Sequence, residues 1–346
     1  MENPARRPKI LIIYTGGTIG MIESPETHTL EPFDFSHLID NVPKIKLLNY
    51  QIDSVSLDPP IDSSNMNPEH WRKIAKVIGK NHRDYDGFVI LHGTDTMAYT
   101  ASALSFMLEN LSKPVIITGS QLPIGEVRTD GEENLITALQ IAADTTAGNI
   151  PMVQEVAILF ENYLWRGNRS TKMSADNFNA FKSNNYPALA KIGLDIHYNV
   201  DALYRTTERR PLRVHTTLET GVLFIDLFPG ITEQSLRHQL STPGVRGIVL
   251  KTFGAGNAPT AKWFIDSISD AIKDGKVIVN VTQCVNGGVQ HLYQSSDGLV
   301  SAGIVSGHDI TAEAAITKLM YLFGLGLTPQ DVAEHFGHSI CGELSE

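Results

Sequence analysis

The sequence predicts an α/β protein with a larger N-terminal domain, in which helices cover both faces of a mostly parallel sheet, and a smaller C-terminal α/β domain. Short apolar runs alternate with amphipathic stretches along most of the chain, which is typical of this architecture. The length of 346 residues also favours two domains, since one domain takes roughly 150 residues. A break in the alternation over residues 181–213 indicates where the domains join.

Each predicted element of the first half comes from its apolar pattern. Continuous apolar runs predict buried strands at 9–14, 87–92, 114–119 and 156–161. Apolar residues at helical spacing predict helices at 68–80, 98–110 and 131–143. The last helix opens on acidic residues, which a helix N-terminus favours because that end of the helix dipole is positive.

Polar, Pro and Gly residues interrupt the pattern after residue 181, and we read 191–213 as a linker between domains 1–190 and 214–346. Residues 194–200 alternatively fit a short strand or hairpin arm. Beyond the linker the same alternation resumes. It predicts strands at 221–228, 246–253 and 276–283, and helices at 260–273 and 311–325.

The composition argues against several classes of protein. A formal charge of −10 disfavours nucleic acid and anionic membranes as partners, because both bind basic surfaces. Cys284 and Cys341 are too few for a disulfide framework, so unbridged thiols are expected. No signal-peptide pattern is present, and no apolar run approaches the roughly 20 residues of a membrane helix. We therefore expect a cytoplasmic protein.

Ligands of open parallel sheets bind beyond the carboxyl ends of the strands, and Gly and Thr are concentrated at those ends here. The predicted strands are followed by Tyr14–Gly20, His92–Thr96, Thr118–Gln121 and Glu161–Lys172. None of these segments carries the dinucleotide fingerprint, the P-loop or the serine-hydrolase elbow. The histidines lack metal-ligand spacing, so neither a cofactor nor a metal is expected.

The strand ends supply hydroxyls, one acid and one lysine. A threonine hydroxyl becomes an effective nucleophile when a base takes its proton. Thr94, Asp95 and Lys172 fit such a relay, with Lys172 as the base and Asp95 orienting it. Each residue alone also fits a structural role, and Asp95 could simply cap the helix that follows it.

These motifs resemble the bacterial-type L-asparaginases and glutaminases, and in particular their cytoplasmic type I subgroup. The two signatures of that family stand unaltered at Thr15–Ile19 and His92–Thr96. Further matches are 63–67, 118–121, 128–131, Asn134, 168–172, 251–257 and 280–283. The resemblance extends over nearly the whole chain, from Lys9 to Phe336.

The resemblance implies a role for each matched residue. Thr18 attacks the side-chain amide of L-asparagine, ammonia leaves, and water hydrolyses the resulting ester. Thr94, Asp95 and Lys172 form the second catalytic cluster, which activates the nucleophile or the water. The residues that grip the α-amino and α-carboxylate groups of the substrate are Asp62, Ser63, Ser64, Thr94 and Asp95.

One departure concerns the mobile loop after the first signature, where many relatives carry a tyrosine. This chain has none there, and His28 takes the corresponding offset. Either His28 assumes the polar role of the lid, or it is a solvated loop residue and Lys172 serves as base. We favour the second interpretation.

The resemblance also implies a homo-oligomer, either a dimer or a tetramer, and a possible allosteric site. Thr171, Lys251 and Cys284 stand where members of the subgroup bind a second asparagine, but Lys251 replaces an arginine. Lysine cannot grip a carboxylate with two parallel hydrogen bonds. We therefore expect no effective allostery and a buried structural Cys284.

The favoured function is an L-asparaginase, and several other functions compete with it. A mixed asparaginase–glutaminase differs by one methylene of substrate, and the amide-hydrolysing component of a tRNA amidotransferase usually carries an extra N-terminal domain. A non-catalytic amino-acid sensor would need neither Thr18 nor Lys172. A nucleotide-binding dehydrogenase is disfavoured because its fingerprint is missing.

Overall fold

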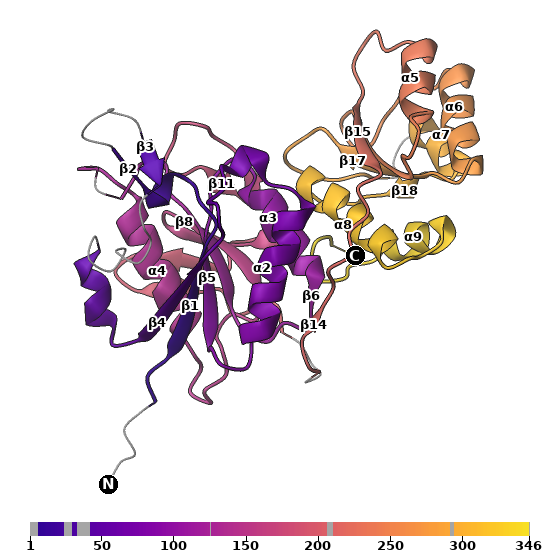
Figure 1. The fold of residues 1–346 in the computed structure, drawn as a ribbon. Coiled ribbons are helices and arrows are strands. Elements are labelled where there is room, and N and C mark those ends of the chain that lie inside the picture. The colour runs from indigo at the N-terminus through magenta and orange to yellow at the C-terminus, as the bar shows by residue number, and fades with distance from the viewer. Residues whose placement is uncertain are drawn as a thin grey trace. The chain divides into compact units, whose positions relative to one another are not determined.

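The computed structural model describes residues 6–23, 30–32, 42–124, 126–205, 210–290 and 294–345. The chain forms two compact units, Met1–Thr216 and Thr217–Glu346 (Figure 1). Each unit holds its own sheet with helices packed against it, and the sheet is mostly parallel in the first unit and parallel in the second. The predicted fold class is confirmed.

The first unit is built on an eight-stranded sheet. In spatial order the strands are β13 (Ile196–Tyr198), β12 (Ala190–Ile192), β9 (Tyr163–Arg166), β8 (Val156–Phe160), β7 (Val115–Thr118), β5 (Gly87–Leu91), β1 (Lys9–Tyr14) and β4 (Gln51–Ser56). The five strands β8, β7, β5, β1 and β4 run parallel to one another. The other three strands, β9, β12 and β13, each pair antiparallel with the preceding one, beginning with β9 on β8. The carboxyl ends of β1, β5, β7 and β8 therefore lie along one edge of the sheet.

Three helices of the first unit flank this sheet. They are α2 (Pro68–Asn81), α3 (Met97–Met107) and α4 (Gly131–Ala143). α2 and α3 lie on one side and α4 on the other (Figure 1). The central strands β1, β5, β7 and β8 are almost entirely apolar because both faces of the sheet are covered there. Ile10 and Ile12 belong to the core that includes α4, while Leu11 and Ile13 are also buried but lie outside that cluster.

Shorter elements connect these parts. They are the 3₁₀ turns η1 (Thr18–Gly20), η3 (Pro43–Leu48), η4 (Ser63–Asn65) and η5 (Gly167–Arg169), and the strands β2 (Met21–Glu23), β3 (Leu30–Pro32), β6 (Leu108–Glu109), β10 (Thr171–Lys172), β11 (Phe181–Lys182) and β14 (Arg213–Val214). The predicted helix 98–110 ends early because β6 pairs with β14 and Asn110 takes a positive φ.

The expected linker 191–213 differs from the segment seen here. Residues 190–198 form the β12–β13 hairpin of the main sheet, which is the alternative that the sequence left open. Leu194, at the tip of this hairpin, is an apolar residue that is fully exposed. An apolar residue in the turn disturbs the alternation of polar and apolar residues that would have identified the two strands. The boundary between the two compact units falls after Thr216.

The second unit repeats the design on a smaller scale. Its parallel sheet has the order β15 (Val222–Asp226), β16 (Gly247–Thr252), β17 (Val277–Thr282) and β18 (Val305–Ser306). Its helices are α5 (Glu233–Leu240), α6 (Lys262–Lys273), α7 (Gln294–Ala302), α8 (Ala312–Gly324) and α9 (Pro329–Phe336). α5, α6 and α7 share one apolar core with the sheet, whereas α8 packs on β15, β16 and β17.

A buried ion pair holds the C-terminal segment of the second unit. Lys318 on α8 and Glu343 are both fully buried, and their charged groups lie 2.5 Å apart. Lys318 Nζ also donates to the carbonyls of Phe336 and His338, and Glu343 accepts from the backbone N–H groups of Ile340 and Cys341. The pair is thus surrounded by the hydrogen bonds that a buried charge requires.

Breaking this pair should destabilise the protein strongly. Glu343→Gln leaves the Lys318 ammonium buried without its counter-ion, so the free energy of unfolding should fall by about 3–5 kcal/mol. The matched control is Lys262→Met, which removes an exposed i,i+4 pair with Asp266 and should change stability by less than about 0.5 kcal/mol. Denaturant unfolding followed by circular dichroism compares the two, and equal losses would contradict the assignment.

A second buried polar group, His92, lies directly after β5. Trp71 Nε1 donates to Thr100 Oγ1 at 2.9 Å, so the Thr100 hydroxyl proton is free to point at His92 Nε2, 2.8 Å away. His92 Nδ1 then carries the ring proton and donates to the Gly93 carbonyl at 2.6 Å. Burial of this neutral ring lowers the pKa of His92 to about 4.

His92 should therefore make stability depend on pH. The unfolded chain binds a proton near pH 6.5 and the folded chain only near pH 4. Stability is thus complete above pH 6.5 and falls as the pH drops toward 4, by up to about 1.4 kcal/mol per unit. Nitrogen NMR of labelled histidine should show a neutral, Nδ1-protonated His92 at pH 5. Titration of this ring near pH 6.5 would refute the arrangement.

Candidate active site

Two glycines bring three loops together at the carboxyl edge of the first sheet. Gly16 and Gly17 have φ values of 123° and 91°, which residues with a Cβ rarely adopt. A Cβ on Gly16 would collide with the backbone of Ile61, and one on Gly17 with the backbone of Gly93. The turn that precedes Thr18 is therefore packed directly against Ile61, which precedes the segment 62–64, and against Gly93 of the segment 92–96.

Backbone hydrogen bonds fix the same junction. The N–H and the hydroxyl of Thr15 both donate to the Leu91 carbonyl, at 3.0 and 2.9 Å. The N–H of Ile61 donates to the Thr15 carbonyl at 2.7 Å. The sequence predicted that these strand ends meet, and the parallel register of β1 and β5 is what brings them level.

The predicted relay residues lie in direct contact. Lys172 Nζ is 2.8 Å from Thr94 Oγ1 and 2.6 Å from Asp95 Oδ1. The Lys172 side chain is 18% exposed and that of Asp95 63%, so the carboxylate faces solvent while the ammonium is largely covered. Asp95 does not cap α3, because the N-cap position is Thr96.

Gln121 joins this cluster, although sequence reasoning gave it no role. Thr94 Oγ1 is 3.4 Å from Gln121 Oε1, and Gln121 Nε2 donates to the carbonyls of Ala175 and Asn177. Both carboxylate oxygens of Asp130 accept from the Gln121 N–H at 3.0 Å. The family matches at 118–121 and 128–131 contain Gln121 and Asp130 and could have indicated a role for them, but nothing in the sequence predicted that these two residues are in contact.

The threonines at the strand ends divide into two kinds. Thr15 and Thr118 are buried, and their hydroxyls donate to the carbonyls of Leu91 and Leu159 on neighbouring strands. Thr18 opens η1 and is only partly buried. Its side chain makes no hydrogen bond within the described part of the chain. The Thr18 hydroxyl is thus available to a ligand, whereas the other two are committed to the fold.

The segment 62–64 presents a carboxylate and a hydroxyl on an exposed turn. Asp62 caps η4, and its Oδ1 accepts from both the N–H and the hydroxyl of Ser64 at 2.9 Å. These hydrogen bonds hold the pKa of Asp62 below its usual range, with the backbone N–H as the larger cause. Asp62 is therefore an anion suited to a cationic group, while Ser63 is buried.

The remaining candidates are distributed over both units, and His28 lies outside the described residues. Thr171 belongs to the first unit and is partly buried. Lys251, in the second unit, forms an ion pair with Asp226 at 2.8 Å. The expectation of a buried Cys284 was wrong: it is an exposed free thiol in the loop after β17, where its N–H donates to Thr282 Oγ1. Cys341 is partly buried and is not part of a disulfide.

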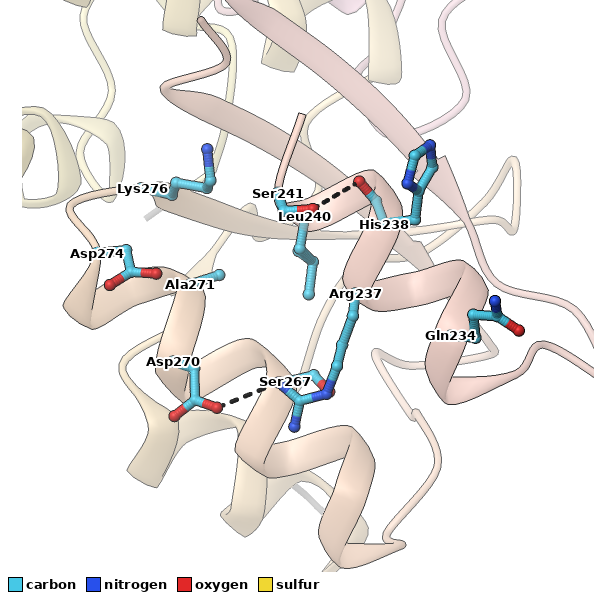
Figure 2. A pocket seen from close by; sticks show the side chains of 10 residues that line it. All are labelled: Gln234, Arg237, His238, Leu240, Ser241, Ser267, Asp270, Ala271, Asp274 and Lys276. Atoms are coloured by element: carbon cyan, nitrogen blue, oxygen red, sulfur yellow. Dashed lines mark hydrogen bonds and ion pairs between the residues drawn. The ribbon is translucent and has the colours of Figure 1, made fainter. Parts of the chain in front are cut away.

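Other parts of the described chain offer less chemistry. A cavity of about 540 Å³ lies between α5 and α6 of the second unit, and Figure 2 shows its mixed acidic and basic lining. Arg237 at this cavity already pairs with Glu233 and Asp270. No group of three or more potential metal ligands occurs among the described residues. No described helix is long and apolar enough to cross a membrane.

The chain is similar to known proteins over almost its whole length. Residues 9–204 match the family "Asparaginase, N-terminal", and residues 221–336 match "Glutaminase/Asparaginase C-terminal domain". L-asparaginase 1 of Escherichia coli K12 is 41% identical, over 98% of this chain and 99% of the relative. The crystal structure of L-asparaginase I from Vibrio cholerae superposes with a TM-score of 0.90 at 39% identity, covering 99% of this chain and all of the other.

A relative of lower identity is an L-asparaginase of Thermococcus kodakarensis. This enzyme is 32% identical, over 97% of this chain and 99% of the relative. Its structure superposes with a TM-score of 0.88 and covers 98% of this chain and 99% of the other. The two family matches together span most of the chain and both of its units. The chain therefore belongs to the asparaginase family.

Proposed function

We propose that the protein is an L-asparaginase, which hydrolyses the side-chain amide of L-asparagine to L-aspartate and ammonia through an acyl-enzyme on Thr18. The observation that carries the proposal is the contact of Lys172 with both Thr94 and Asp95. It is supported by the glycine turn before Thr18, whose hydroxyl makes no hydrogen bond to the described residues. The names of the E. coli and V. cholerae relatives support the same reaction.

The reaction follows from the chemistry of these groups. The Thr18 oxygen attacks the amide carbon, its proton is transferred to the departing nitrogen, and ammonia leaves a β-aspartyl ester. Water then attacks the ester, restores the hydroxyl and releases aspartate. Lys172 donates to Thr94 Oγ1, so the lone pairs of Thr94 are polarised and its own proton points away from Lys172. Thr94 can thereby pass a proton between Lys172 and the reacting oxygen.

Substrate binding uses opposite charges. Asp62 and Asp95 are exposed carboxylates on two loops held together by the glycine turn, and both suit the α-ammonium group of an amino acid. Charge-assisted hydrogen bonds of this kind are the stronger ones in proteins. The hydroxyl of Ser64 and the backbone of 62–64 suit the α-carboxylate. Asparagine and glutamine differ by one methylene, which a small pocket separates by about 1–3 kcal/mol, so ammonia release is measured with both amides.

We also infer a homo-oligomer, dimer or tetramer, with a cytoplasmic location. Neither cysteine is part of a disulfide, and Cys284 is exposed, which supports a reducing compartment. The ion pair of Lys251 with Asp226 supports the expectation that no second asparagine is gripped there, because the lysine charge is already compensated. Ammonia release as a function of asparagine concentration tests this point, and a sigmoidal curve would oppose it.

Thr18→Ala should abolish ammonia release while the protein still binds L-aspartate, because only the attacking oxygen is removed. We expect a loss of more than about 10⁴-fold in kcat, and partial recovery in Thr18→Ser, which keeps a hydroxyl. Acid quenching of the wild type should trap one aspartyl group on the peptide that contains Thr18. Full activity of Thr18→Ala would remove Thr18 from the mechanism. A folded wild type that binds amino acids but releases no ammonia would indicate a sensor.

Lys172→Met should lower kcat by about 10²–10⁴-fold, the usual contribution of one proton-transfer group. The matched control is Lys182→Met, because Lys182 lies on β11, the strand paired with β10, and is exposed. It should leave kcat unchanged. Steady-state assays with asparagine compare the two variants, and similar kcat values would contradict the role of Lys172.

A further inference from the structure

Thr96 stands at the N-cap of α3 but does not cap that helix. An N-cap threonine ordinarily accepts a hydrogen bond from a backbone N–H in the first turn of its own helix. Thr232, Thr311 and Thr328 do so at the starts of α5, α8 and α9. The Thr96 side chain makes no such bond. Its hydroxyl donates instead to the Ser63 carbonyl, 2.7 Å away.

The Ser63 carbonyl is fully used by this arrangement. It accepts the N–H of Met66 at 3.1 Å within η4 and the hydroxyl of Thr96 from the other loop. Both lone pairs of the oxygen are thereby engaged. On the other side of the residue, the Ser63 hydroxyl lies so close to Gly93 that a Cβ there would be 2.5 Å from it. Ser63 is 4% exposed, so the turn is anchored at its buried middle residue.

This anchor connects two exposed carboxylates that otherwise belong to separate loops. Asp62 precedes Ser63, and Asp95 precedes Thr96. The bond from Thr96 to Ser63 therefore sets the separation of the residues that flank the two acids. An ammonium group held by two carboxylates is sensitive to that separation, because charge-assisted hydrogen bonds need donor–acceptor distances near 2.7–2.9 Å.

We propose that Thr96 is a positioning residue for substrate binding: its hydroxyl, by holding the Ser63 carbonyl, fixes Asp62 relative to Asp95 for the α-ammonium group of the substrate. This inference rests on the proposed function. Thr96 touches no reacting atom and carries no charge, so its loss acts on binding of the amino group and leaves the chemistry of Thr18 in place.

The experiment uses Thr96→Val, which keeps the shape and removes the hydroxyl, and Thr96→Ser, which restores it. Two substrates are compared: L-asparagine, and succinic acid monoamide, which lacks the α-amino group. We expect Thr96→Val to raise KM for asparagine about five- to tenfold, the effect of one hydrogen bond, with little change in kcat. KM for the monoamide should be the same in all variants. Thr96→Ser should behave as the wild type.

The control for a purely structural effect is Thr232→Val, the same substitution at an N-cap where the hydroxyl does cap its helix. It should lower the melting temperature and leave both KM values unchanged. Equal increases in KM for both substrates in Thr96→Val, or a loss confined to kcat, would overturn the proposal. So would a Thr96→Val enzyme indistinguishable from the wild type.

Binding measurements separate this inference from the proposed function. Calorimetry with L-aspartate and with succinate reports the amino-group contribution without turnover. If the wild type releases no ammonia, the proposed activity is refuted. The positioning role is still retained if Thr96→Val binds aspartate more weakly than the wild type does and binds succinate equally well. Ammonia release by the wild type with unchanged aspartate affinity in the variant would retain the activity and refute the positioning role.

Discussion

The close approach of backbone to backbone at Gly17 and Gly93 is the constraint on which the candidate site depends. Thr18 and Thr94 each follow one of these glycines, so their separation is set where no side chain intervenes. A Cβ at either position would meet neighbouring atoms, Gly93 backbone in one case and the Ser63 side chain in the other. A rigid sheet positions such loops more accurately than the loops can position themselves. The parallel register of β1 and β5 therefore determines the site as much as the reactive residues do.

The Lys172–Asp95 ion pair orients the two side chains at the site and contributes little to the free energy of unfolding. Exposed ion pairs contribute about 0–1 kcal/mol, and the Asp95 side chain is 63% exposed. By contrast, Lys318 and Glu343 are fully buried and orient a terminal segment of the second unit. The two lysines use the same charge differently. The partner of Lys172, Asp95, faces solvent and can bind the ammonium group of a substrate in place of Lys172, whereas the partner of Lys318, Glu343, is buried and cannot contact a ligand.

Much of the fold could be predicted because buried strands and amphipathic helices leave periodic patterns. The strands at 9–14 and 277–282 and the helix at 131–143 lie where the apolar residues indicated. The edge strand β4 was missed because all of its residues are exposed or only partly buried, so no continuous apolar run marks it. The hairpin β12–β13 was foreseen only as an alternative to the linker, because its strands are three residues long and each contains an exposed residue. Helix α9 was missed as well, although its Thr328 and Asp331 form a capping box.

For the candidate site, the sequence predicted which residues meet but not why one threonine hydroxyl rather than another is available to a ligand. Parallel strand ends brought Thr94, Asp95 and Lys172 to one edge, and the resemblance of the paired signatures singled out Thr18, but the residue pattern alone gave no physical reason to separate Thr18 from the other threonines. Thr15, Thr96 and Thr118 are chemically the same as Thr18, and their roles differ in what their hydroxyls contact: a strand carbonyl for Thr15 and Thr118, a turn carbonyl for Thr96, and no hydrogen-bond partner among the described residues for Thr18. That information is tertiary. The resemblance named Thr18, but the physical reason for that choice is that the fold gives the competing threonines other partners, and this reason is visible only once the chain is folded.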